Sequence, residues 1–301
     1  MDAAEPRIVD AHFHLWDLDE NSYPWLTDAS RPSLVHGREA LRRNYVVADY
    51  LRDIGTLNVV AGVHVQAEHD PGDRVRETRW LQHVAVQPDA RGFPHAIVAD
   101  ADFASPDVAE VLEQHASFPN VRGIRFALHR RLDESPPYDP LLDPAWCRNF
   151  GLLAKHNLSF DLQLFPRQSQ AAVELIRRYG DVQFVLTHCA MPFLRDPANV
   201  ARWSRSLRAY AEHPNVAIKI SGFGAFDPGW NARSIDGIVS EVVAAFGTSR
   251  CMLASNFPVE GLVKPYRDIW NTYLEYFAPY SQDEREMLFC RNAARIYRIA
   301  V

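Results

Sequence analysis

Two histidines two positions apart lie inside an apolar segment near the start of the chain. The segment reads IVDAHFHLWD over residues 8–17 and holds His12 and His14. Successive side chains of a β-strand point to opposite faces, so this spacing places both imidazoles on one face. Paired imidazoles on a rigid strand can bind a divalent metal such as zinc or manganese, or they can hydrogen-bond to backbone and carboxylate groups. The pattern alone leaves both interpretations open.

A third histidine and several other polar residues occur near the ends of further apolar segments. The stretch VLTHCAMP holds His188, and VHVQAE holds Gln66 and Glu68. The remaining polar residues in such positions are Arg125, Asp161, Gln163, Lys219, Ser221, Ser255 and Asn256. Polar groups enclosed in a protein need partners or neutralisation, so their convergence predicts a functional site. If a metal ion is bound, His188 would supply the third nitrogen ligand beside His12 and His14; the protein could equally be metal-free.

Two cationic residues in these segments each allow a functional and a structural interpretation. Arg125 in GIRF could bind a substrate carboxylate through a bidentate pair of hydrogen bonds, or form a salt bridge with Glu68 or Asp161. Lys219 in AIKISG is either paired inside the protein or used in catalysis. Both belong to the candidate substrate-binding residues. That set is Trp16, Trp25, Gln66, Arg125, Gln163 and Lys219.

The neighbours of the histidines receive simpler interpretations. Cys189 directly follows His188, but adjacent strand residues face opposite ways, so a thiol–imidazole pair is not expected and Cys189 is assigned to packing. Trp16, Tyr23 and Trp25 follow the first histidine pair. They either line a pocket or attach their loop to the rest of the fold.

The elements that must position these residues follow a regular alternation. Eight short apolar segments occur at residues 7–16, 57–68, 93–103, 120–128, 158–165, 182–190, 215–224 and 250–259. Their β-branched composition is typical of strands buried on both faces. Amphipathic helical patterns cover residues 74–86, 108–117, 144–157, 169–180, 201–213 and 235–247. Alternating strands and helices predict parallel pairing, and eight units favour a closed (β/α)8 TIM barrel over an open sheet.

Two long insertions and a final helix complete the predicted architecture. Residues 17–45 follow the first strand, and residues 129–143 follow the fourth. Long loops often bind ligands, and both lie on the side where barrel active sites are found. Residues 281–300 predict a closing helix. The 301 residues suit one barrel domain, residues 1–301, since such a domain typically needs about 250.

Composition narrows the classes of partner. The net charge is −6 and no basic block occurs, so we expect neither nucleic acid nor an anionic membrane as a partner. The expected partner is a small-molecule substrate. No apolar run approaches the length of about 18 residues that a membrane span requires. The start MDAAEPR lacks the features of a signal peptide, and four scattered cysteines suit a reducing compartment, so we expect a cytoplasmic protein. The oligomeric state stays open, a homo-oligomer included.

Several of these motifs, taken in order, resemble the amidohydrolase superfamily, and within it the lactonase-like branch. The motifs are DAHFHLWDL, YPWL, GIRF, THCAMP, IKISGFG, SNFPV and RNAARIYRI, and they extend over nearly the whole chain. The resemblance implies a distorted barrel that hydrolyses a ring ester, with or without one divalent metal ion. It also implies that His12, His14 and His188 surround the site. Arg125 would bind a substrate carboxylate or polarise its carbonyl.

One position departs from the family pattern. The superfamily usually ends its eighth strand with an aspartate that takes the proton of the attacking water, whereas this chain reads ASNFPVE and places Asn256 there. An amide has no basic site near neutral pH. A metal ion on the three histidines could make hydroxide without a strong base, leaving Asn256 to orient water or substrate. Alternatively Glu68, Glu260 or a neutral histidine takes the proton, or the protein binds a ligand without hydrolysing it.

The sequence therefore predicts a hydrolase that opens a lactone of a sugar acid or small carboxylic acid by attack of water on the carbonyl. His12, His14, Glu68, His188 and Asn256 are its predicted catalytic residues. The alternatives are a metal-dependent decarboxylase of the same superfamily and a ligand-binding pseudoenzyme.

Overall fold

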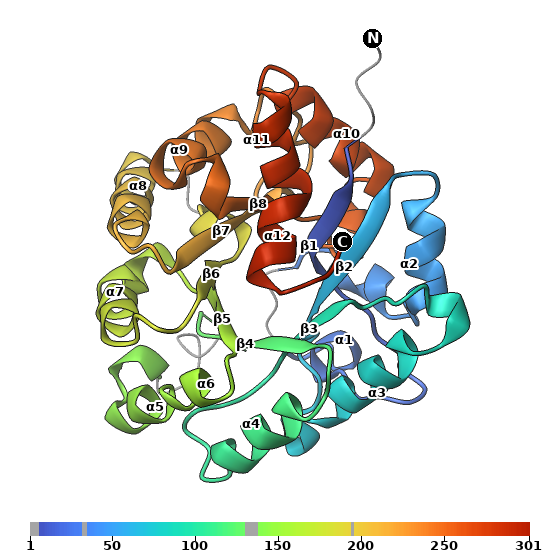
Figure 1. Cartoon of the computed structure of the whole chain (residues 1–301), viewed down its shortest axis with the longest axis vertical. Helices are drawn as coiled ribbons and strands as arrows, with labels where there is room; N and C mark the ends of the chain where they lie inside the picture. Colours follow the sequence, from blue (N-terminus) through green and yellow to red (C-terminus); the bar gives the residue numbers. More distant parts are fainter. Residues whose placement is uncertain (1–5, 32–34, 130–137, 194–195) are drawn as a thin grey trace.

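The computed structural model describes residues 6–31, 35–129, 138–193 and 196–301. Eight parallel strands form one sheet in which each strand pairs with the next along the chain. They are β1 (Ile8–Phe13), β2 (Val59–Val65), β3 (Ala96–Ala99), β4 (Val121–Ala127), β5 (Ser159–Gln163), β6 (Phe184–Leu186), β7 (Val216–Ile220) and β8 (Cys251–Leu253). The sheet curls into a nearly closed barrel surrounded by helices (Figure 1), which confirms the predicted TIM-barrel architecture.

The helices that cover the barrel agree with the amphipathic segments and add three that periodicity did not predict. The predicted ones are α3 (Arg76–Ala85), α4 (Val108–Ala116), α7 (Ser169–Arg178), α8 (Pro197–Ala211) and α9 (Asp236–Phe246). The predicted helix 144–157 is divided into α5 (Pro144–Asn149) and α6 (Leu152–Lys155). The additional helices are α1 (Pro24–Thr27), α2 (Val47–Ile54) and α10 (Tyr266–Tyr276). No described helix is long and apolar enough to cross a membrane.

The strands separate two apolar clusters, as their alternating side chains require. Large residues such as Phe160 and Phe184 face the helices and join the larger cluster. The opposite faces carry small or β-branched residues that fill the barrel itself. This interior cluster contains Val9, Ala11, Ala61, Val63, Val65, Ala96, Val98, Val185, Ala217, Met252 and Ala254.

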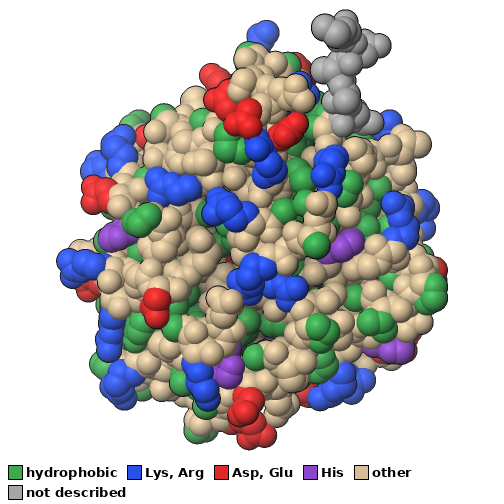
Figure 2. All heavy atoms as spheres, viewed as in Figure 1, with side chains coloured by type: hydrophobic (Ala, Val, Ile, Leu, Met, Phe, Trp, Pro, Cys, Tyr) green, Lys and Arg blue, Asp and Glu red, His purple; other side chains and the backbone are tan. Residues whose placement is uncertain are grey.

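The predicted closing helix is present in two pieces. It consists of α11 (Gln282–Glu286) and α12 (Asn292–Ile296), which are joined by a π-helical turn at Met287–Arg291. Figure 1 shows α12 lying across one end of the barrel. Ala293, Ile296 and Tyr297 belong to the interior cluster, so this segment seals that end of the barrel. On the same face, Figure 2 shows basic side chains scattered among neutral and apolar ones.

The seam between β1 and β8 is closed by loop residues instead of a regular ladder. Phe13 and Phe257 form an isolated parallel bridge. The His14 amide donates to the Phe257 carbonyl over 2.8 Å, and the Asn256 amide donates to the His12 carbonyl over 2.8 Å. The histidine pair and the residue that replaces the family aspartate are therefore fixed to one another through the backbone.

Asp10 fixes the same seam from the helix side. Its buried carboxylate accepts hydrogen bonds from the Ser255 amide at 2.9 Å and the Ser255 hydroxyl at 2.6 Å. The Tyr50 hydroxyl of α2 and the Tyr266 hydroxyl of α10 donate to it over 2.9 and 3.1 Å. The His12 amide adds a fifth donor at 3.3 Å, so this one carboxylate joins β1, the segment after β8 and two helices at the edge of the site.

The first insertion folds back on the barrel. The Trp16 and Tyr45 backbones form an antiparallel bridge with reciprocal hydrogen bonds of 2.9 Å, so the two ends of the insertion meet. The insertion contains α1 and a 3-10 turn at Arg38–Leu41. Most of the second insertion, residues 130–137, lies outside the described residues.

Candidate active site

A pocket of about 680 Å³, part of it open to solvent, lies where the strands end. Most of its walls come from residues near or just after the carboxyl ends of β1, β2, β4, β5, β6, β7 and β8, which is the usual position of a barrel active site. The first insertion adds Trp25 and Val35. The lining residues are His14, Trp25, Val35, Ala67, Glu68, Arg125, His129, Gln163, His188, Met191, Phe193, Gly222, Ala225, Asn256 and Val259.

A local irregularity in β1 turns His12 toward the barrel interior. Val9 and Ala11 face inward, whereas Asp10 faces α2 and α10. Strict alternation would place His12 on the side of Asp10. The pairing of β1 with β2 shifts register between Asp10 and Phe13, and such a bulge re-aims a side chain.

The predicted histidine pair forms a close contact. Nε2 of His12 and Nε2 of His14 are 3.2 Å apart, and both side chains are buried. Nδ1 of His14 lies 2.6 Å from the Val65 carbonyl, which can only accept, so Nδ1 carries the proton. In the neutral ring Nε2 of His14 is then an acceptor, and the proton shared by the pair sits on Nε2 of His12.

The residues that follow β7 position the His188 ring. Its Nδ1 lies 3.0 Å from the Ser221 hydroxyl. A Cβ atom on Gly222 would lie 2.7 Å from Cγ and Nδ1 of His188, and Gly222 has a φ of +76°. The ring therefore fits only against a glycine. The ring centroids of His12 and His188 are 4.8 Å apart, so the three predicted histidines converge.

Burial keeps these three imidazoles neutral near pH 7. It lowers the pKa of His188 to about 3 and holds those of His12 and His14 well below the ordinary value. The positive charges of Arg125 and Lys219 add to this effect. Neutral imidazoles can donate or accept a hydrogen bond toward a substrate without carrying charge.

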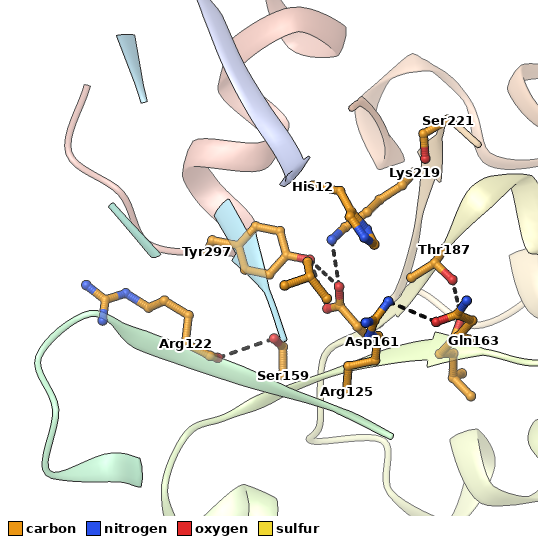
Figure 3. Close-up of polar contacts among 12 residues, drawn as sticks. His12, Arg122, Arg125, Ser159, Asp161, Gln163, Thr187, Lys219, Ser221 and Tyr297 are labelled. Atoms are coloured by element: carbon orange, nitrogen blue, oxygen red, sulfur yellow. Dashed lines mark hydrogen bonds and ion pairs between the residues drawn. The ribbon is translucent and has the colours of Figure 1, made fainter. Parts of the chain in front are cut away.

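Arg125 points its guanidinium group into the pocket from β4. One nitrogen donates to the side-chain oxygen of Gln163 over 2.9 Å (Figure 3). Another donates to the Gln66 carbonyl. The Gln66 side chain in turn donates to the Arg125 carbonyl over 3.3 Å. Two predicted substrate-binding glutamines thus hold the arginine, and of these two only Gln163 lines the pocket.

Lys219 forms a buried ion pair below the pocket lining. Its ammonium group donates to Asp161 over 2.6 Å, and both side chains are fully buried. The Tyr297 hydroxyl donates to the same carboxylate over 2.8 Å (Figure 3). Lys219 is therefore paired with Asp161, as the structural interpretation of this lysine expects. Its positive charge also helps to lower the pKa of His12.

The strand ends differ from the sequence prediction. Segments 182–190 and 250–259 were expected to be strands, but β6 and β8 stop at Leu186 and Leu253. His188, Cys189 and the two residues after them have φ near +50°, and Asn256 has φ +55°. These left-handed residues turn the chain across the barrel mouth, which overturns the premise that residues 188 and 189 alternate along a strand. Cys189 is nevertheless buried, and its Sγ pKa is raised to about 12 by burial.

The predicted aromatic residues lie at different depths. Trp25 lines the pocket, and its indole N–H donates to the Ala67 carbonyl over 2.6 Å. Trp16 lies behind Trp25 with ring centroids 5.9 Å apart, and its indole N–H donates to the Arg43 carbonyl. Trp16 is completely buried and serves to attach the insertion, so it is not part of the described pocket lining.

Comparison with known proteins shows the family of this chain. The family model described as amidohydrolase matches residues 9–299. The chain belongs to the amidohydrolase family. An uncharacterised protein of Sinorhizobium fredii is 42% identical over 97% of this chain and 98% of its own length. A protein of Burkholderia ambifaria named L-fucono-1,5-lactonase is 29% identical over 97% of this chain and 95% of its own length. A crystal structure of an amidohydrolase from Burkholderia multivorans with bound zinc has a TM-score of 0.81 at 25% identity. The match covers 98% of this chain and 100% of that one.

The donor set of this amidohydrolase fits a resident metal ion poorly. A tetrahedral zinc ion holds two nitrogen ligands about 3.3 Å apart, so the 3.2 Å between His12 and His14 is compatible with a shared ion or with one hydrogen bond. Among the described residues, however, no group of three His, Cys, Asp or Glu side chains is arranged to hold one. Arg125 and Lys219 also place positive charge at the pair.

Eight residues that line the amidohydrolase site were not among the predicted site residues, and His129, Met191 and Phe193 are three of them. His129 lines the pocket directly after β4, and its place at the end of a strand was a usable signal. Met191 and Phe193 add apolar side chains to the lining, for which the sequence offered no signal because Met191 ends the left-handed turn and Phe193 follows it.

Proposed function

We propose that this amidohydrolase opens a lactone by adding water to its carbonyl group. The observation that carries the proposal is that Arg125, Glu68, His188 and Asn256 line one pocket at the carboxyl ends of the strands. This set supplies a cation for a developing oxyanion, a carboxylate for a proton and two neutral polar groups for orientation. The lactonase relative supports the same chemistry.

Each residue has a defined task in this reaction. The Arg125 guanidinium stabilises the negative charge that develops on the carbonyl oxygen. Asn256 and neutral His188 orient the attacking water, and Glu68 accepts its proton. The new bond joins the water oxygen to the carbonyl carbon. The ring C–O bond then breaks, and Glu68 returns the proton to the leaving oxygen, so the product is a hydroxy acid. No step requires a metal ion.

The pocket favours a small acid as the substrate class. Arg125, His129 and Gln163 form a polar side that suits a carboxylate or hydroxyl group. The lining also contains the apolar side chains of Met191, Phe193 and Val259, which suit a ring or a methyl group. We therefore propose a lactone of a sugar acid or small carboxylic acid.

A panel of lactones tests the proposal. Purified protein is mixed with L-fucono-1,5-lactone, other sugar-acid lactones and carboxylated lactones, and acid release is followed with a pH indicator. Mass spectrometry should show a product heavier by one water, and Glu68→Gln should abolish its formation. Release of carbon dioxide without addition of water would identify a decarboxylase. Saturable binding without turnover would identify a ligand-binding protein.

A further inference from the structure

The turn that carries Glu68 into the pocket follows β2 and consists of Gln66, Ala67 and Glu68. Glu68 has a φ of +58°, a left-handed conformation that is uncommon for residues other than glycine. A residue keeps such a conformation only where its surroundings hold the backbone in place. The contacts of this turn therefore decide how the Glu68 side chain reaches the pocket.

Gln66 fixes the start of the turn to β3 and β4. Its side-chain oxygen accepts a hydrogen bond from the Glu68 amide over 2.5 Å, and its side-chain nitrogen donates to the Arg125 carbonyl over 3.3 Å. Its backbone amide donates to the Val98 carbonyl of β3 over 2.7 Å. Gln66 is thus bound both to the residue that carries the carboxylate and to the residue that carries the guanidinium group.

Two side chains from outside the turn hold the backbone of Ala67. The indole N–H of Trp25, in α1, donates to the Ala67 carbonyl over 2.6 Å. The Ala67 amide donates to Oε1 of Glu77, in α3, over 3.0 Å, and this contact is buried. A buried N–H group without an acceptor is unfavourable, so Glu77 favours the position of the turn in which this hydrogen bond forms.

Glu77 occupies a position that the helix would otherwise give to an apolar side chain. Glu77, Leu81 and Ala85 follow one another at intervals of four residues along the buried face of α3. Glutamate is almost never fully buried unless it is paired, and burial raises the pKa of Glu77 to about 8. Whether protonated or ionised, the carboxyl group keeps an oxygen that accepts the Ala67 N–H. A polar side chain in this apolar row indicates a task that leucine or alanine could not perform.

We propose that Glu77 is a positioning residue that fixes the Ala67 backbone and thereby presents Glu68 to the pocket. Glu77 is not among the described lining residues, so it acts through Glu68 and not on the substrate. The inference rests on the proposed lactonase function for what Glu68 does there, which is to take the proton of the attacking water. The hold on the turn itself depends only on the hydrogen bonds described above.

Amide hydrogen exchange measures the hold on the turn and needs no substrate. Methionine is unbranched like glutamate but offers only a weak acceptor, so Glu77→Met removes the hydrogen bond with little change of shape. We expect the Ala67 and Glu68 amides of this variant, followed by NMR in 15N-labelled protein, to exchange about 10-fold faster or more. Glu77→Gln keeps an oxygen for the Ala67 N–H and should retain slow exchange. Unchanged exchange in Glu77→Met, or a change confined to Ala67, overturns the proposal.

Asn292→Leu is the matched control for the loss of a buried polar side chain. Asn292 is 3% exposed, and its side-chain amide donates to the Thr248 and Cys251 carbonyls over 2.7 and 2.6 Å, at the amino end of β8. This variant should also lose stability, but its Ala67 and Glu68 amides should exchange slowly. Equal acceleration in Asn292→Leu and Glu77→Met would show a global effect and overturn the proposal. Glu77→Leu replaces Glu77→Met if thermal melting shows that the methionine variant does not fold.

Turnover then tests whether the position of Glu68 matters for the reaction. Misplacing a reacting group by about 1 Å can reduce a rate by about 100-fold, so kcat of Glu77→Met should fall about 10- to 100-fold with KM near wild type. Glu77→Gln and Asn292→Leu should keep kcat close to wild type. A wild-type kcat in Glu77→Met would overturn the positioning role. If the wild-type protein hydrolyses no lactone, the proposed function fails, and the exchange experiment still decides whether Glu77 holds the turn.

Discussion

The ammonium group of Lys219 donates to the Asp161 carboxylate over 2.6 Å while both side chains are fully enclosed in the barrel. Removing one member of such a pair leaves an uncompensated buried charge, which typically costs about 3–5 kcal/mol. Lys219→Met should therefore lower the free energy of unfolding by about that amount, measured in urea. The double variant Lys219→Met with Asp161→Asn should lose less than the sum of the two single variants. Additive losses would show that the two charges do not stabilise each other.

The close contact between Gly222 and the His188 ring gives a second prediction. Gly222→Ala places a Cβ atom 2.7 Å from the imidazole ring and forces alanine to a φ of +76°. Displacing a substrate-facing group by about 1 Å can reduce a rate by about 100-fold, so we expect a large loss of kcat and a modest loss of stability. Gly237→Ala in α9 is the matched control, because no heavy atom lies within 4 Å of its added Cβ. Normal turnover by the Gly222 variant would remove His188 from the proposed reaction.

Arg125 and Arg122 lie on the same strand and offer a matched comparison. Arg125 lines the pocket, whereas Arg122 lies near the start of β4 and donates to the Val121 carbonyl. Arg125→Ala should raise KM if the group anchors the bound lactone, and should also lower kcat if it stabilises the oxyanion. Arg122→Ala should leave both constants near wild type. Unchanged kinetics in Arg125→Ala would exclude that residue from the site.

Removal of metal ions should leave hydrolysis intact. The His12–His14 pair supplies two nitrogen donors beside two cationic side chains, which is a weak site for a divalent ion. Protein treated with a chelator and separated from it should keep its activity to within about a factor of two, with its metal content checked by plasma mass spectrometry. Loss of activity that is restored by one zinc ion per chain would contradict this expectation.

The stability of the protein should respond to pH through its buried neutral groups. His188 has a pKa of about 3 when folded and an ordinary value of 6.5 when unfolded, so the unfolded chain binds more protons below pH 6.5. Its contribution to stability therefore falls as the pH falls. His188→Asn should reduce the loss between pH 7.5 and 5.5 by about 1.4 kcal/mol relative to wild type, measured by urea unfolding. An identical pH dependence in both proteins would contradict a neutral buried ring.

Glu77 should act in the opposite direction, which provides an internal check. Burial raises its pKa to about 8 from an ordinary value of 4.5, so the folded state holds a proton that the unfolded state has released. Its contribution is largest at low pH and is lost as the pH rises from 4.5 through 8. Glu77→Gln should thus remove about 2.5 kcal/mol of the stability that wild type gains on acidification from pH 7.5 to 5.5.

The sequence predicted the eight strands because each is a short apolar run between amphipathic helices. Every observed strand is shorter than its predicted segment. In β6 and β8 the reason is that Thr187 onward and Ala254 onward continue the apolar composition while the backbone turns. The turns depend on contacts such as the Asn256 amide with the His12 carbonyl, which join the two ends of the barrel. Local periodicity does not report contacts of that kind.

The candidate site was predictable as a set of residues but not as a geometry. Placing polar residues at strand ends identified His14, His188 and Arg125, which all line the pocket. The same rule could not show that Arg125 lines the pocket whereas Lys219 is paired in the interior. Lys219 binds the Asp161 carboxylate, which also accepts a hydrogen bond from Tyr297 near the far end of the chain. Nor could it show that Glu68 lines the pocket whereas the buried Glu260 is not among the lining residues.

The hydrogen bonds of Asp10 have a consequence for the order in which the molecule forms. Asp10 and Ser255 are 245 positions apart, and Asp10 and Tyr266 are 256 apart. Contacts of such high sequence separation carry the largest loop-closure entropy and tend to slow folding. The histidine pair meets Asn256 only when this last closure occurs. We therefore expect compact folding intermediates to lack the pocket, so that recovery of activity after dilution from urea follows the slowest phase of refolding.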